Sequence, residues 1–191
     1  MYNSSWLNLY GDIINSNGLI EGINRFKENG ADAQLADQYI AEIRVMRAFA
    51  YLQAARLWGD LFIFESSDPT TLVDMEIAEF EEVMQHISDQ MDLAIPDLPD
   101  ARPNQRTDIQ NGITRYAALA IKAYANLELK NWQETVNATD EIISSGLFEL
   151  YPDFYDAFNI PGKNSNESIL ELQYSDFGQS SGTNTRYLWN F

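Results

Sequence analysis

The stretch TRYAALAIKAYANLELKNWQETVNATDEIISSG, residues 114–146, decides the fold because it encodes two helices joined by a minimal turn. On both sides of Asn131, apolar or small residues recur every three or four positions, which is the spacing of an amphipathic helix. We expect helices over about 114–130 and 132–145, with Gly146 as the left-handed cap that ends the second one. Two antiparallel helices of this size match the unit of a tetratricopeptide repeat.

Small side chains support this hairpin, whose bounds are about 112–146. Ala117, Ala120 and Ala123 fall where the first helix would pack against its neighbours. Thr135 and Thr139 stand where the second helix of such a repeat often carries alanine, so the match to the repeat consensus is partial. The pattern predicts a repeat-like pair of closely packed helices.

The N-terminal part reads as three more helices, over about 5–26, 32–58 and 75–95. The 32–58 helix is apolar around much of its circumference, which is typical of a helix buried on several sides. The 75–95 helix has one apolar stripe opposite a polar face, which predicts a surface helix. These two helices are expected to form a looser second hairpin, widened by the long loop between them.

The character of the chain changes after Gly146, and residues 147–191 read as a region of loops with one strand. Aromatic residues are dense over 151–158, and we interpret this block as a hydrophobic cover on the last helix. Alternating apolar residues over 169–174 predict a short β-strand. The expected fold class is therefore all-α, with tetratricopeptide-like helical hairpins, long loops and one short C-terminal strand.

Length, charge and cysteine content exclude several classes of protein. With 191 residues and 45% hydrophobic residues, the chain is one domain or part of a larger one. Its net charge of −17 disfavours a nucleic acid or an anionic lipid surface as partner, because both would repel it. It has 0 cysteines, which excludes thiol nucleophiles, disulfides and cysteine-ligated metals. No run of about 18–20 apolar residues predicts a membrane span.

The residues offer little for catalysis, and we expect a protein that is not an enzyme. The single histidine, His86, is on the polar side of its helix and is expected to be solvated or at the boundary of the core. With one histidine and no cysteine, Ser–His–Asp, Cys–His and two-histidine zinc chemistry have little or nothing to work with. With 29 acidic residues, any carboxylate pair is uninformative about glycoside hydrolysis.

We expect no cofactor and no metal site. Asp97, Asp100 and Asp108 share one loop and Asp153 and Asp156 another, but neither follows the spacing of an EF-hand. A weak surface calcium site is the alternative. Solvated loop acids are the better account of these residues.

The C-terminal tail carries the side chains that sugar binding requires. Flat aromatic rings stack on the C–H faces of sugars, and amides or arginine hydrogen-bond their hydroxyl groups. The alternative is that these rings pack against polypeptide outside this sequence. The candidate ligand-binding residues are Phe177, Asn184, Arg186, Tyr187 and Trp189.

Other conspicuous side chains receive structural interpretations. Three tryptophans lie on apolar helix stripes and are expected in the core, whereas three arginines of the 32–58 helix are expected to pair with acids or cap loop carbonyls. The tryptophans are Trp6, Trp58 and Trp132, and the arginines are Arg44, Arg47 and Arg56.

An ordered series of segments resembles the SusD/RagB family, which comprises cell-surface glycan-binding lipoproteins of Bacteroidetes nutrient-uptake systems. The segments are WLNLY (6–10) with IINSN (13–17), EIRVMRAFAY (42–51) ending in RLWGDL (56–61), AALAIKA (117–123) followed by NW (131–132) and DEIISSGLFEL (140–150), and ESILELQY (167–174). The resemblance spans nearly the whole chain. The chain departs from the family pattern at Phe62, where the family usually has proline, and at Ile113, where it usually has arginine.

The resemblance implies a function. Such a protein binds an oligosaccharide or similar nutrient reversibly, without catalysing a reaction, on the extracellular face of the outer membrane. It delivers the ligand to a TonB-dependent transporter of the SusC type, against which the helical repeats pack. Its only link to the membrane is an N-terminal lipid on a cysteine that this sequence lacks, so residues 1–191 resemble an internal fragment of a SusD-like helical-repeat domain. The alternative is a soluble tetratricopeptide-like scaffold for protein–protein interaction.

Overall fold

The computed structural model describes residues 3–72, 75–159 and 162–172, and within these ranges it is built from α-helices and short 3₁₀ turns. The α-helices are α1 (Asn3–Glu28), α2 (Ala33–Trp58), α3 (Phe80–Ala94), α4 (Arg115–Glu128) and α5 (Trp132–Ser144). The 3₁₀ turns are η1 (Pro69–Leu72), η2 (Ile95–Asp97), η3 (Pro103–Gln105) and η4 (Asp156–Phe158). The expected all-α class is confirmed.

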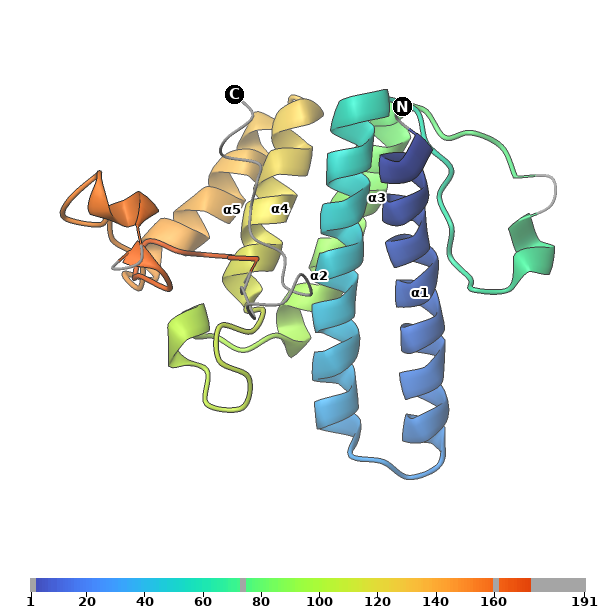
Figure 1. Cartoon of the computed structure of the whole chain (residues 1–191), viewed down its shortest axis with the longest axis horizontal. Helices are drawn as coiled ribbons and strands as arrows, with labels where there is room; N and C mark the ends of the chain where they lie inside the picture. Colours follow the sequence, from blue (N-terminus) through green and yellow to red (C-terminus); the bar gives the residue numbers. More distant parts are fainter. Residues whose placement is uncertain (1–2, 73–74, 160–161, 173–191) are drawn as a thin grey trace, which may run out of the picture.

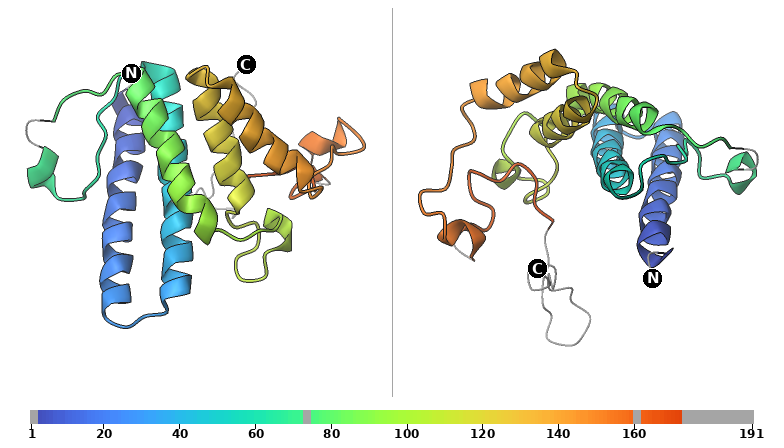
Figure 2. Two further views of the ribbon diagram at one scale, coloured as in Figure 1. Left: turned by 180° about the vertical axis from the view of Figure 1, so that it is seen from behind. Right: turned by 90° about the horizontal axis from the view of Figure 1, so that it is seen from above.

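Each helix packs on its neighbour in the sequence, and α2 also contacts α4 (Figure 1). The long helices α1 and α2 run side by side and antiparallel, α3 lies behind them, and the α4–α5 hairpin extends the stack on the other side of α2 (Figures 1 and 2). This order explains why α2 is apolar around much of its circumference. It is the one helix here that touches α1, α3 and α4.

The α4–α5 hairpin forms where its sequence predicts. A turn of three residues, with Lys130 at φ 60°, reverses the chain, and Gly146 has φ 64°, as expected for a left-handed cap. Ala117, Ala118 and Ala125 are buried with exposures of 1% or less, so the small residues allow α4 to approach its neighbours closely.

The outer helix α5 corrects one expectation. Trp132 was expected in the core but is 60% exposed, and Val136 and Ile143 on the same stripe are 47% and 75% exposed. The reason is that α5 packs on α4 alone among the described helices. The side of α5 that carries Trp132, Val136 and Ile143 therefore has no helix of the described part of the chain against it. Trp6 and Trp58 do pack against the core and meet edge to face at 5.2 Å, as expected.

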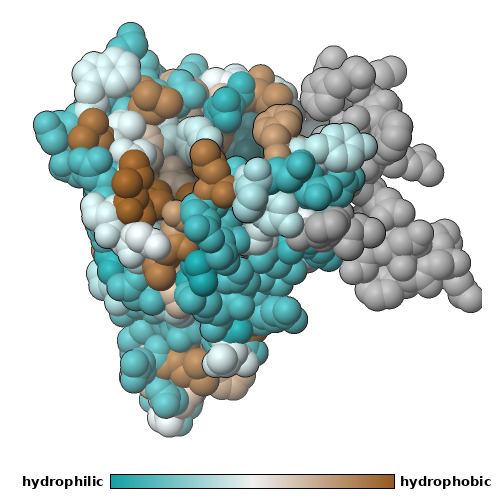
Figure 3. Space-filling model, turned by 90° about the vertical axis from the view of Figure 1, so that its left-hand side faces the viewer, coloured by the Kyte–Doolittle hydropathy of each residue, from teal (hydrophilic) through white to brown (hydrophobic). Residues whose placement is uncertain are grey.

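The aromatic block after α5 is a second correction. Phe154, Tyr155 and Phe158 are 82%, 77% and 71% exposed, so they do not cover the last helix. Phe148 packs at the base of the hairpin, edge to face with Tyr116, after which the chain turns away from α5. Hydrophobic side chains therefore gather on the face that α5 and the loops after it present (Figure 3).

The third helix begins five residues later than expected. The predicted start at 75 is wrong, because Ala78 is paired with Leu61 in an antiparallel bridge with both backbone hydrogen bonds formed. Glu79 then caps the helix in a capping box with Glu82, which fixes Phe80 as the first helical residue.

The strand expected over 169–174 is not confirmed. Residues 169–172 form no ladder, because no described segment lies beside them as a strand partner, and residues 173–174 are outside the described ranges. Ile169 and Leu170 instead pack their side chains against the helical core.

An extended segment, 61–67, is held on α1 and α2 by side chains from the two helices. The Tyr10 hydroxyl accepts a hydrogen bond from the Phe62 N–H at 2.9 Å and donates to the Phe62 carbonyl at 3.3 Å. The Tyr51 hydroxyl does the same for Phe64, at 2.7 and 3.3 Å. A proline at position 62 would have no N–H for Tyr10, so the family departure at Phe62 has a structural consequence.

Candidate ligand-binding site

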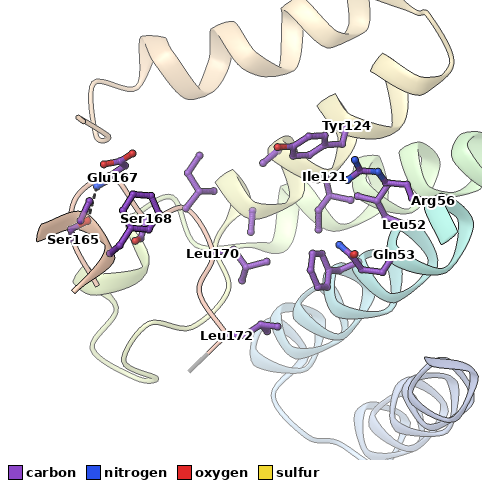
Figure 4. A pocket seen from close by; sticks show the side chains of 16 residues that line it. Leu52, Gln53, Arg56, Ile121, Tyr124, Ser165, Glu167, Ser168, Leu170 and Leu172 are labelled. Atoms are coloured by element: carbon purple, nitrogen blue, oxygen red, sulfur yellow. Dashed lines mark hydrogen bonds between the residues drawn. The ribbon is translucent and has the colours of Figure 1, made fainter. Parts of the chain in front are cut away.

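A pocket of about 570 Å³ lies between α2, α4 and the loop segment 157–172 (Figure 4). We call it the apolar pocket, because Phe49, Ile121 and Leu170 supply much of its lining. Its volume lies in the range of about 300–1,000 Å³ that small-molecule sites occupy.

Polar side chains stand on two sides of the apolar pocket. Gln53 and Arg56 come from the C-terminal half of α2, and Tyr124, which is 53% exposed, comes from α4 (Figure 4). Ser165, Glu167 and Ser168 line the opposite side (Figure 4). An apolar floor with an exposed ring and hydrogen-bonding groups at the rim suits a ligand that has both apolar faces and hydroxyl groups.

The wall of the apolar pocket is held in place by Glu171. Its carboxylate accepts a hydrogen bond from the Asn164 N–H at 3.0 Å and another from the Ser168 hydroxyl. Ile169 and Leu170 anchor the same segment by packing on the core. The loop therefore has a defined path along α2 and α4 although it contains no regular secondary structure.

The connection between η2 and α4 is fixed by Arg106, whose side chain is 1% exposed. Its guanidinium donates to Glu42 of α2 at 2.7 Å, to Asp108 at 2.5 Å and to the carbonyl of Ile113 at 2.6 Å. The hydrogen bond from Arg106 to Asp108 holds the pKa of the Asp108 carboxyl well below its ordinary value. Asp108, one of the loop acids considered for a weak calcium site, is thus paired with an arginine.

The candidate residues of the tail lie outside the described part of the chain. Phe177, Asn184, Arg186, Tyr187 and Trp189 all belong to 173–191, so the structure tests none of them. Leu172, the last described residue, lines the apolar pocket, and Phe177 follows it by five positions in the sequence.

The apolar pocket contains residues that sequence analysis did not single out as a site. Gln53 and Tyr124 received no role from the sequence, and Arg56 was given a structural role. That role is confirmed in part, because Arg56 Nε lies 3.8 Å from Glu128 Oε1. No local pattern marks this pocket, because its lining residues come from α2, α4 and a loop that are distant in the sequence.

The arginines in the middle of α2 bind amides in place of acids. Arg47 is buried, with 8% exposure, and donates to Asn17 of α1 and, at 2.6 Å, to Gln90 of α3. Arg44 also donates to Gln90, at 3.3 Å. Asn17 in addition donates to the carbonyl of Phe64 at 2.8 Å. Hydrogen bonds of Asn17 and Arg47 thus connect α1 with α2, α3 and the extended segment 61–67.

His86 lies at the boundary of the core, as expected. Its ring packs edge to face on Tyr51 at 5.6 Å, and its Nε2 atom is buried without a hydrogen-bond partner among the described residues. Burial lowers the pKa of His86 below its ordinary value of 6.5, and the Arg47 guanidinium lowers this pKa further.

We expect His86 to destabilise the fold in mild acid. Below pH 6.5 the unfolded chain takes up a proton at this histidine while the folded chain resists it, so the free energy of unfolding falls as the pH is lowered. The slope is at most about 1.4 kcal/mol per pH unit for one proton. Urea unfolding between pH 7.5 and 5.5 measures it, with His86→Gln as the comparison.

The free energy of unfolding of His86→Gln should depend less on pH than that of the natural chain. Glu21 and Asp108 also have lowered carboxyl pKa values, but the stability that these carboxylates contribute is lost only at pH values below 5.5. Equal slopes for the two proteins would contradict the assignment to His86.

The described residues contain no cluster of three or more side chains that could hold a metal ion. Within the same ranges, no helix combines the length and apolar character that crossing a bilayer requires. The features observed define a class: an all-α protein of stacked helical hairpins that carries a ligand-sized pocket beside its C-terminal loops.

The family model described as SusD-like, "starch-binding associating with outer membrane", matches residues 1–127. The chain belongs to the SusD-like family. Members of this family are non-catalytic glycan-binding proteins, which agrees with the sequence argument against an enzyme.

The similar proteins include both sequences and solved structures. A SusD-like protein of Bacteroides ovatus is 26% identical over 196 residues, covering 95% of this chain and 34% of the relative. A SusD-like carbohydrate-binding protein of Bacteroides fragilis is 21% identical with a TM-score of 0.78, covering 90% of this chain and 33% of the other. A laminarin-binding SusD-like protein is 19% identical with a TM-score of 0.76, covering 87% and 36%. The chain thus spans about a third of the length of these relatives.

Proposed function

We propose that this chain is part of a protein that reversibly binds an oligosaccharide or similar nutrient on the extracellular face of the outer membrane. The observation that carries the proposal is the match of residues 1–127 to a starch-binding family associated with that membrane. The apolar pocket supports it, because an apolar floor with Tyr124 and polar rim groups offers what a sugar ring needs.

We further propose that the ligand contacts of the tail are Tyr187 and Trp189, together with the polar groups of Asn184 and Arg186 and the ring of Phe177. A loop rich in glycine, serine and asparagine presents flat rings to solvent more readily than a packed helix does. The tail also follows directly after Leu172, a lining residue of the apolar pocket.

Replacing Trp189 by alanine in the full-length protein should weaken glycan affinity by about 1–3 kcal/mol, the value of one stacked ring on analogous stacking platforms. The melting temperature should stay nearly unchanged, because a ring in a solvent-facing loop contributes little to the core. Isothermal titration calorimetry with a panel of neutral gluco-oligosaccharides measures the affinity.

A matched control is Trp132→Ala, which removes a 60% exposed tryptophan from α5 and should leave glycan affinity unchanged. If Trp189→Ala lowers the melting temperature and leaves affinity intact, the tail is part of the packed core and the contacts lie elsewhere. If the natural protein binds no glycan of the panel, the proposed function itself is wrong.

Delivery to a TonB-dependent transporter of the SusC type, and anchoring by an N-terminal lipid, complete the proposal. The exposed stripe of Trp132, Val136 and Ile143 on α5 supports a protein partner for the helical repeats. Co-purification of a SusC-type transporter with the tagged full-length protein from its native cells tests the pairing. A helical-repeat scaffold for other proteins would retain different partners and would bind no glycan.

A further inference from the structure

A second pocket, of about 340 Å³, lies between η3, the segment 149–152 and the loop 163–166. We call it the polar pocket, because its lining includes Asn104, Glu149, Lys163 and Asn166. It is separate from the apolar pocket, but Ser165 lines both of them. A ligand that extends beyond one site could therefore reach the other around this loop.

Hydrogen bonds between three segments give the polar pocket a rigid frame. The Asn166 side chain donates to Glu149 Oε1 at 3.0 Å, and the Glu149 N–H donates to the Asn166 carbonyl at 3.3 Å. Asn104 Nδ2 donates to the Asn164 carbonyl at 3.0 Å and to Asn166 Oδ1 at 3.2 Å. Segments that are distant in the sequence thus position the polar groups before any ligand arrives, which lowers the entropic cost of binding.

The frame leaves hydrogen-bonding capacity unused. Because Asn104 Nδ2 is fixed between two acceptors, its Oδ1 atom must be the acceptor, and this buried atom has no partner among the described residues. Lys163 is exposed and forms no ion pair within the described ranges, although the chain carries a net charge of −17. The Lys163 ammonium carries three donors at the polar pocket, and these match the hydroxyl oxygens of a sugar, which accept hydrogen bonds.

Exposed rings continue from the edge of the polar pocket. Pro152 lines it, and Phe154 and Tyr155 follow with 82% and 77% of their surfaces exposed. Phe154 meets Phe158 edge to face at 5.2 Å, and Phe158 also lines the apolar pocket. A saccharide site needs two components, which are polar groups that hydrogen-bond the sugar hydroxyls and aromatic rings on which the C–H faces of the sugar stack.

We propose that the polar pocket is a saccharide subsite that binds one neutral sugar unit of the oligosaccharide, an assignment that rests on the proposed function. The size of the pocket, at the low end of the small-molecule range, suits a single ring. The sugar is neutral because a chain of net charge −17 repels polyanionic glycans over distances up to the Debye length. Lys163 donates to its hydroxyls.

The test compares Lys163→Met with the natural full-length protein. Methionine keeps most of the aliphatic stem and removes the ammonium group, and no hydrogen bond of the frame involves Lys163. Calorimetry with malto-, laminari- and xylogluco-oligosaccharides first identifies the neutral glycan that binds best. For that glycan, Lys163→Met should weaken affinity roughly tenfold or more, the effect of losing a charge-assisted hydrogen bond.

Lys130→Met, an exposed lysine in the α4–α5 turn, is the matched control and should bind like the natural protein. Unchanged affinity in Lys163→Met, with binding by the natural protein intact, overturns the subsite and leaves the proposed function standing. Absence of binding to every neutral glycan overturns both. Tighter binding of polygalacturonate than of any neutral glycan overturns the assignment to a neutral sugar.

Discussion

Replacing Arg106 by alanine should lower the free energy of unfolding by about 3–5 kcal/mol, as expected when one partner of a buried ion pair is removed. The side chain is 1% exposed, and its partner Glu42 is 13% exposed. Without the guanidinium, the Glu42 carboxylate and the Ile113 carbonyl lose a buried donor. Chemical denaturation at pH 7 measures the change.

Two variants show whether the effect arises from this cluster. Lys27→Ala removes a surface pair with Asp37, in which the side chains are 37% and 34% exposed, and should cost less than about 1 kcal/mol. A methyl group at Gly112 would lie 2.6 Å from Arg106 Nη1, so Gly112→Ala should destabilise the natural protein by displacing the arginine. In the Arg106→Ala background this penalty should vanish. Additive effects in the double variant would contradict the packing of Gly112 on Arg106.

Tyr51→Ala should be comparably destabilising, by about 3–5 kcal/mol, because it removes a fully buried ring from the middle of the core. Tyr51→Phe keeps the ring and isolates the hydrogen bonds to the extended segment. Burial raises the pKa of the Tyr51 hydroxyl well above its ordinary value, so the group remains protonated and donates to the Phe64 carbonyl. Loss of the hydroxyl leaves the Phe64 N–H unpaired, whereas the Phe64 carbonyl keeps its hydrogen bond from Asn17 at 2.8 Å, and the change should cost about 1–3 kcal/mol.

The readout for both Tyr51 variants is urea denaturation together with hydrogen exchange of the Phe64 amide. Tyr51→Phe should speed exchange at Phe64 while α4 and α5 keep their protection. Tyr155→Ala, at a ring that is 77% exposed, is the control and should change stability by no more than about 0.5 kcal/mol. If Tyr51→Phe matches the natural protein in both measurements, the segment 61–67 is not held by this hydroxyl.

The amino-acid sequence determined the helices that have a clean local signature. The α4–α5 hairpin, its short turn and the Gly146 cap follow from apolar spacing and from the conformational freedom of glycine, and both are properties of neighbouring residues. The unusual burial of α2 was also predictable, since apolar residues surround most of that helix. The order of such segments was enough to indicate the family that the comparison over 1–127 then identified.

Tertiary structure decided which apolar faces are covered and what the polar residues bind. Periodicity marks the apolar side of a helix but contains no information on whether a neighbour lies against it, so Trp132 was misplaced in the core. The partners of Tyr10 and Arg106 lie 52 and 64 positions away in the sequence, so no local pattern records them. The polar pocket likewise exists because residues near 104, 149 and 163 converge, and only packing of the whole chain brings them together.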